Sequence, residues 1–202
     1  MDEENEPNKT EISKKELKPN NNNKISKRKQ SLKVKEKEIE INIKIVNTIS
    51  ELLNNMCKEN NTAEANNYNI SSNKKILLFM LKKVPSISIK DFLLRLLKYS
   101  KINDSTFVYI LIIIDRFCRK YMIKINYYNI YKLILASLVI AVKVNEDEYY
   151  SSEFYAKIGG ISKVEMNKLE YELSVMINFD FFVKEELFYK YYDLLNYSNE
   201  EG

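Results

Sequence analysis

The sequence predicts an all-α protein, and two observations support this. Of 202 residues only three are glycine and three are proline. Beyond Pro85 the chain has no proline, and before the terminal Gly202 it has only Gly159 and Gly160, so residues that interrupt helices are rare. Apolar residues also recur every three or four positions, which is the period of a helix that buries one face. The length is enough for one domain with tails.

Residues 1–37 are expected to form a disordered arm. They contain Asn20 to Asn23, charges of alternating sign and almost no apolar periodicity. The basic cluster at 24–29 is either a nuclear import signal or simply a solvated, lysine-rich part of the arm. No apolar stretch follows Met1, and the longest apolar run, at 133–142, is too short to span a membrane. A soluble protein without a membrane partner is therefore expected.

Residues 38–84 are predicted to form two flanking helices around an Asn-rich loop at about 60–73. The second helix is the shorter and covers 74–83. The first covers 38–57, and its apolar residues recur at helical spacing: Ile41, Ile45, Ile49, Leu52, Leu53 and Met56.

Five further helices are predicted within residues 85–182, and a sixth at about 184–195 within the C-terminal segment 183–202. The helices at 105–122 and 127–144 are apolar on nearly every face, so the others should surround them. Capping residues place the first three of these helices at 89–100 after Ser88, at 105–122 after Asp104 and at 127–144 after Asn126. The fourth covers 152–158 and ends at Gly159 and Gly160, where glycine can take the left-handed conformation that closes a helix. The fifth begins at the capping box of Ser162 and Glu165.

Five segments together carry a resemblance to a known family. They are residues 85–89, 92–99, 114–116, 141–143 and 149–170. Each is a weak signal by itself, but in this order and at this spacing they resemble the cyclin box, most closely that of the P-type and U-type cyclins, which include the fungal phosphate-starvation cyclins. The resemblance implies a single five-helix cyclin box at 85–182 with flanking N-terminal and C-terminal helices.

The resemblance also implies a function and a site. Cyclins are not enzymes; they bind and activate a cyclin-dependent protein kinase by holding its regulatory helix in the active position. By similarity, Lys143 donates to backbone carbonyls of that helix, while Glu170 pairs with Lys143 and accepts from backbone N–H groups. The remaining kinase-binding positions are expected to be Ile140, Val144, Phe179 and Phe181, and also Ser174, where many cyclins have leucine and where the contact should therefore differ.

Structural alternatives accompany these assignments. The Lys143–Glu170 pair is otherwise only a link between two helices. Glu172 is a rival partner for Lys143, but helical geometry places it on the solvent side. Asp115 is expected to be structural and to bond a helix end or Arg95.

Composition disfavours other function classes. The absence of histidine excludes histidine-based catalysis. Cys57 and Cys118 are the two cysteines and show no CxxC spacing, so we expect no zinc site, no cofactor and no disulfide. A protein with so few cysteines fits a reducing compartment, the cytoplasm or the nucleus, best. The net charge is only +4 and the lysines are scattered, so no nucleic-acid partner is expected, although a transcription-type cyclin-box protein acting on nucleic acid stays open. The main alternative is a cyclin-box helical adaptor that binds a non-kinase partner. No segment matches the arginine-containing motif with which mitotic cyclins recruit substrate peptides.

Overall fold

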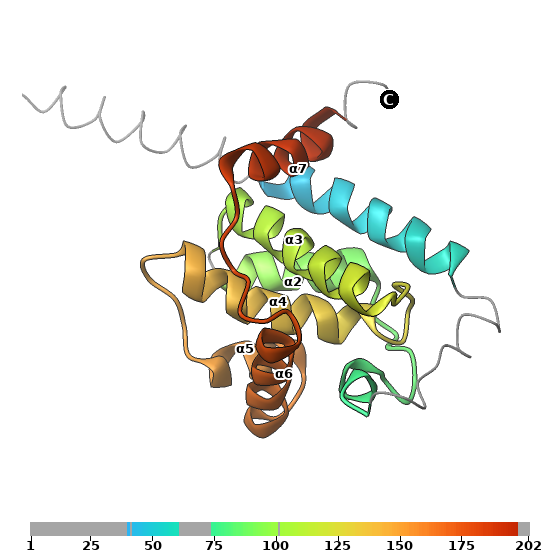
Figure 1. Ribbon diagram of the computed structural model, residues 1–202. Coiled ribbons are helices and arrows are strands. Elements are labelled where there is room, and N and C mark those ends of the chain that lie inside the picture. Colours follow the sequence, from blue (N-terminus) through green and yellow to red (C-terminus); the bar gives the residue numbers. More distant parts are fainter. Residues whose placement is uncertain (1–39, 41, 61–73, 101, 198–202) are drawn as a thin grey trace, which may run out of the picture. The chain divides into compact units, whose positions relative to one another are not determined.

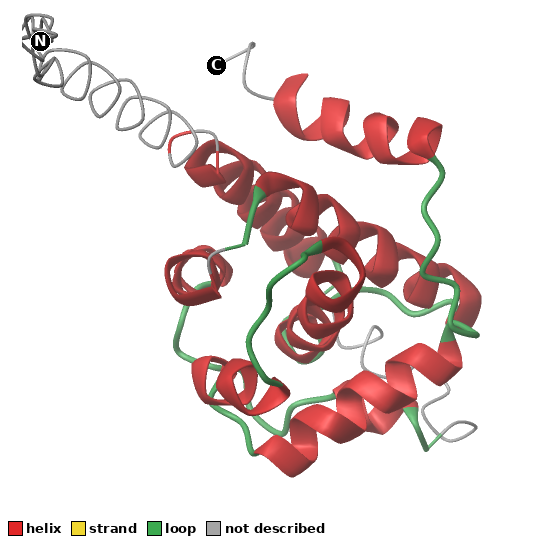
Figure 2. Ribbon diagram, turned by 90° about the vertical axis from the view of Figure 1, so that its left-hand side faces the viewer, coloured by secondary structure: helices red, strands yellow, loops and turns green. Residues whose placement is uncertain are grey.

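The computed structural model describes residues 40, 42–60, 74–100 and 102–197. Within these residues the chain consists of helices and loops with no strand, which confirms the all-α prediction (Figure 2). The predicted arm, its basic cluster and most of the Asn-rich loop lie outside the described residues. Figure 1 labels the helices α2 (Ile89–Ser100), α3 (Asp104–Tyr121), α4 (Ile130–Asn145), α5 (Ser152–Gly159), α6 (Lys163–Met176) and α7 (Glu185–Tyr197).

The first flanking helix covers 42–59 and is the blue-to-cyan ribbon in Figure 1. Ile45, Ile49, Leu53 and Cys57 recur every four residues and are at most 2% exposed. This spacing puts them on one face of the helix, which is the face buried against the core.

The prediction of a second flanking helix at 74–83 is wrong. Only one turn of 3-10 helix, η2 (Ile76–Phe79), forms there. The chain becomes extended at Met80, and the backbone N–H of Leu81 donates to the carbonyl of Tyr128 at 2.7 Å instead of continuing the helix. The Phe79 ring packs on Phe117 with 5.0 Å between ring centres, so tertiary contacts hold this segment where local helical spacing suggested a helix.

Helix α4 is the centre of the core. Every residue from Ile130 to Val142 is buried except Lys132, and α3, α5, α6 and η2 pack around it. Ala136, Ser137 and Ala141 have no exposed surface, because their small side chains let neighbouring helices approach the α4 backbone closely. The predicted pair of central helices, α3 and α4, is therefore present.

Two helices begin at different residues from those predicted. α3 begins after Asn103, whose side chain accepts from the backbone N–H of Thr106 at 3.1 Å and so takes the capping role. α4 begins at Ile130, three residues late, because Asn126 first forms a turn in which its side chain accepts from the N–H of Tyr128 at 2.9 Å.

The two adjacent glycines at the end of α5 have different roles. Only Gly160 takes the left-handed conformation, with φ of 74°, and it closes the helix. Gly159 is the last helical residue and lies against α4, where an added Cβ atom would be 2.2 Å from Cδ2 of Leu135. The predicted helix end with a left-handed glycine is therefore present at Gly160, and Gly159 is needed for a close approach of two helices.

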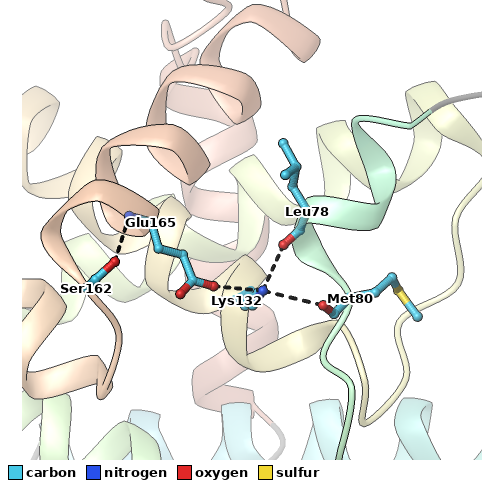
Figure 3. Close-up of polar contacts among 5 residues, drawn as sticks. All are labelled: Leu78, Met80, Lys132, Ser162 and Glu165. Carbon is cyan, nitrogen blue, oxygen red and sulfur yellow. Dashed lines mark hydrogen bonds and ion pairs between the residues drawn. The ribbon is translucent and has the colours of Figure 1, made fainter.

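The predicted capping box at the start of α6 forms only one of its two expected bonds. Ser162 Oγ accepts from the backbone N–H of Glu165 at 3.1 Å. The Glu165 carboxylate instead pairs with Lys132 at 2.8 Å, and the same ammonium donates to the carbonyls of Leu78 at 3.0 Å and Met80 at 3.4 Å (Figure 3). Lys132 thus joins α4, α6 and the segment around η2.

Candidate functional site

The ion pair between Lys143 and Glu170 joins the end of α4 to the middle of α6. Lys143 lies in the last turn of α4, where a positive charge interacts favourably with the helix dipole. Its ammonium bonds Glu170 Oε1, and the two side chains are 35% and 20% exposed. Glu170 Oε2 also accepts from the hydroxyl of Ser152 at 3.3 Å, which ties in the first turn of α5. The ion pair therefore links α4 and α6, as the structural alternative requires, and the Ser152 bond adds α5 to this link.

The same pair also keeps polar capacity that points to a binding role. A lysine ammonium carries three donors and a carboxylate about four acceptor positions. The ion pair uses one donor of Lys143 and one acceptor position of Glu170. The bond from Ser152 uses a second acceptor position of Glu170. Because both side chains reach the surface, the remaining donors and acceptors can meet the backbone of a partner.

The other residues expected at the kinase-binding site fall into an exposed group and a buried group. Val144 is 45% exposed and Phe179 is 59% exposed. Phe181 is half-buried, and its ring lies edge-on to that of Phe179 with 6.0 Å between the ring centres. Ile140 and Ser174, by contrast, are buried at 3% and 7% exposure. These two lie in the core beneath the surface and not on it.

Ser174 supports the pair from within α6. Its hydroxyl donates to the backbone carbonyl of Glu170 at 2.7 Å, one turn earlier in the helix. The serine hydroxyl therefore has a backbone partner, and no leucine-like side chain projects from this position. Ser174 is thus a buried residue of α6.

The segment after α6 is fixed in a conformation that turns an aromatic side chain outward. Asn178 and Phe179 have positive φ values of 58° and 54°, which are uncommon for residues other than glycine. The N–H of Phe179 donates to the carbonyl of Ser174 at 2.8 Å and closes the helix. This closure leaves the Phe179 ring exposed next to the pair-bearing helix.

Arg116 and Phe182 belong to this region although the sequence patterns did not assign them to it. The Arg116 guanidinium donates to the carbonyls of Asp180 and, at 2.8 Å, of Phe182, and it also pairs with the Asp180 carboxylate at 3.4 Å. It thereby holds the aromatic segment against α3. Phe182 is 76% exposed, and the signal that could have identified it is the adjacent aromatic pair of Phe181 and Phe182 outside a predicted helix.

Two predicted electrostatic contacts differ in the structure. Glu172 is not on the solvent side: it is 16% exposed and pairs at 2.8 Å with Lys75, just before η2, because that segment lies over this face of α6. Asp115 does not bond Arg95, which lies on the exposed face of α2. Instead it accepts from Arg119 Nε at 2.9 Å and from the Tyr191 hydroxyl at 2.6 Å.

The described residues offer no metal centre and no membrane span. They contain no group of three or more side chains able to hold a metal ion, and none of their helices is long and apolar enough to cross a membrane. Both cysteines are free thiols, and burial raises the pKa of each to about 12. They are therefore protonated at neutral pH and behave as small core residues.

Comparison with known proteins identifies a family. A family model described as Cyclin matches residues 36–181. The chain is 36% identical over 126 residues to Cyclin-U4-3 of Arabidopsis thaliana, covering 62% of this chain and 58% of that protein. It is 36% identical over 110 residues to Cyclin-P3-1 of Oryza sativa subsp. japonica, covering 54% and 46%. It is 38% identical over 121 residues to the PHO85 cyclin-like protein psl1 of Schizosaccharomyces pombe, covering 59% and 50%. The match thus spans about half the length of these relatives.

Proposed function

The chain belongs to the cyclin family, among relatives of the P and U types, and we propose that it binds and activates a cyclin-dependent protein kinase. The observation that carries the proposal is the half-buried, surface-reaching pair of Lys143 and Glu170 between α4 and α6. In this proposal the chain has no catalytic activity of its own.

The mechanism rests on backbone recognition. Lys143 donates to carbonyls near the start of the kinase's regulatory helix, and Glu170 accepts from N–H groups beside it. Val144, Phe179 and Phe181 provide the exposed apolar area around these polar contacts. Because this surface fits the helix only in its inward position, binding shifts the kinase toward its active conformation, in which its own residues carry out phosphoryl transfer.

Charge reversal separates the binding role of the pair from its structural role. Lys143→Glu or Glu170→Lys alone breaks the pair, and the double variant restores an internal ion pair with reversed polarity. We expect the double variant to regain thermal stability but not kinase binding, because the donor and acceptor groups then face the wrong partners. Loss of a buried charged contact at an interface costs about 2–5 kcal/mol, so the Kd should rise at least about 30-fold.

The measurement is co-purification from native extract, followed by kinase assay and by titration with the purified kinase. A matched control reverses the exposed pair of Glu153 and Lys163, whose side chains are 47% and 58% exposed, and should retain binding. Recovery of kinase binding in the double variant would show that the pair is only structural. Recovery of a non-kinase partner, with no kinase, from wild-type chain would support the helical adaptor alternative instead.

A further inference from the structure

A cavity of about 350 Å³ lies between the helix over 42–59, α3 and α7, together with the loop before α4. Its wall consists mostly of apolar side chains, and none of its lining residues belongs to the proposed kinase-binding surface. The main apolar contributors are Leu53, Met56, Leu111, Ile114, Ile125 and Leu195.

Asp115 and Tyr191 form one polar wall of the cavity, and Asn60 and Lys124 also contribute to its lining. The Asp115 carboxylate accepts from the Tyr191 hydroxyl at 2.6 Å and from Arg119 at 2.9 Å, which leaves part of its acceptor capacity available. The guanidinium of Arg119 already balances its charge. A further neutral donor therefore fits this wall better than a second cation does, and at this wall the Asp115 carboxylate repels an anion.

The size and chemistry of the cavity match a small molecule. Ligand pockets in proteins occupy about 300–1,000 Å³ and combine apolar walls with a few polar groups. Leu52 and Leu194, which line the cavity, are 46% and 60% exposed, so apolar residues extend from the interior to the molecular surface.

We propose that this cavity binds a small apolar molecule that carries one hydroxyl group, with the hydroxyl donating to Asp115. The ligand would contact the helix over 42–59, α3 and α7 at once. Because it binds only the folded arrangement of these three helices, it stabilises the folded state by an amount that increases with the logarithm of its concentration above its Kd. The site is independent of the proposed kinase-binding function.

Three probes of similar shape test the chemistry on the full chain: 4-butylphenol, butylbenzene and 4-butylbenzoate. The readouts are the thermal unfolding midpoint and the rate at which iodoacetamide alkylates Cys118, a cavity-lining thiol, followed by peptide mass spectrometry. Alkylation is run at pH 9, because burial raises the pKa of Cys118 to about 12 and leaves very little thiolate at neutral pH. We expect 4-butylphenol to raise the midpoint and slow alkylation at least about tenfold when nine-tenths or more of the sites are filled. Butylbenzene should have a weaker effect and 4-butylbenzoate none. An absence of protection by 4-butylphenol up to its solubility limit, or equal effects of the phenol and the benzoate, would refute the site.

Two cavity variants and one control variant test where 4-butylphenol binds. Leu194→Trp places a larger ring at an exposed lining position and should abolish protection by 4-butylphenol, whereas Leu77→Trp, at a leucine that is 45% exposed on η2, should leave it unchanged. Asp115→Asn should reduce the preference for the phenol over butylbenzene. Unchanged protection in Leu194→Trp, or an unchanged preference in Asp115→Asn, would overturn the proposal. Kinase binding by Leu194→Trp should equal that of wild type, so failure of this proposal is distinguishable from failure of the proposed function.

Discussion

At the scale of single residues, Lys132 is a partly buried charge whose partners come from two other parts of the chain. Its side chain is 15% exposed and its ammonium meets one carboxylate and two backbone carbonyls. All three bonds are charge-assisted, and they replace the water that burial removes. The residue therefore holds the start of α6 and the segment around η2 in place on α4.

Lys132→Met should destabilise the fold, because it keeps the methylene stem but leaves Glu165 and two carbonyls without their donor. Unsatisfied buried polar groups cost about 1–3 kcal/mol, and urea unfolding would measure the loss. The control is Lys163→Met, which removes an exposed pair with Glu153 and should change stability by less than about 1 kcal/mol. Equal effects of the two variants would contradict the structural role of Lys132.

Tyr191 should make stability fall at alkaline pH. Burial is the largest cause and the hydrogen bond to Asp115 the second, and together they raise the pKa of Tyr191 from 10.0 to about 12. The folded state thus favours the protonated phenol, so its contribution is fully present below pH 10 and is lost as the pH rises toward about 12. Urea midpoints at a series of pH values from 8 to 11.5 would show a shallower alkaline decline for Tyr191→Phe than for wild type. Parallel curves would exclude this contribution.

At the scale of elements, α5 shows how one short helix positions two others. Ser151 caps the start of α5, where its hydroxyl oxygen accepts from the backbone N–H of Phe154. The hydroxyl of Ser152, the first residue of α5, donates to Glu170 of α6. At its other end Gly159 lies against Leu135 of α4. Through these contacts α5 helps to set the relative position of the helices that carry Lys143 and Glu170.

The glycines of α5 should respond differently to alanine. Gly159→Ala forces the buried Leu135 out of its place, and overpacking costs about 1–3 kcal/mol. Gly160→Ala places a side chain on a left-handed backbone, which costs about 1–2 kcal/mol. A double-mutant cycle separates the mechanisms: in a Leu135→Ala background the cost of Gly159→Ala should shrink, while that of Gly160→Ala should not. Chemical denaturation measures each corner, and identical cycles for both glycines would disprove this distinction.

At the scale of the described molecule, stability should be uneven. Nearly every residue of α4 is buried. Among the α7 residues whose burial the structure describes, only Leu195 is buried. Two hydroxyl bonds hold α7 on α3, from Tyr191 to Asp115 at 2.6 Å and from Tyr192 to Asp104 at 3.1 Å. α7 therefore contributes fewer buried contacts than the core helices and should open more readily.

Hydrogen exchange should follow this difference in burial. Amides of α4 are expected to exchange only on global unfolding, and those of α7 at least about tenfold faster through local opening. Peptide-level exchange monitored by mass spectrometry would test this, with α3 as an internal reference that should resemble α4. Equal protection of α7 and α4 would mean that α7 unfolds only together with the core.

Much of the helical organisation could be predicted because its signals are local. Apolar spacing indicated α3, α4 and the helix over 42–59, and serine caps indicated the starts of α2 and α6. The predicted helix starts were less accurate at α3, where Asn103 and not Asp104 has the capping role, and at α4, where Asn126 first forms a turn. η2 was mispredicted as a helix because a backbone bond to Tyr128, far along the chain, determines its end.

The sequence by itself determined the helical class, the order of the helices and the pairing candidates Lys143 and Glu170. Only the tertiary structure decided which side chains of the candidate site reach the surface, and it placed Ile140 and Ser174 in the core. It also decided the partners of Glu172 and Asp115, which lie on other elements. The physical reason is that helix formation depends on neighbours within about one turn, whereas ion pairs and burial depend on how separate helices pack.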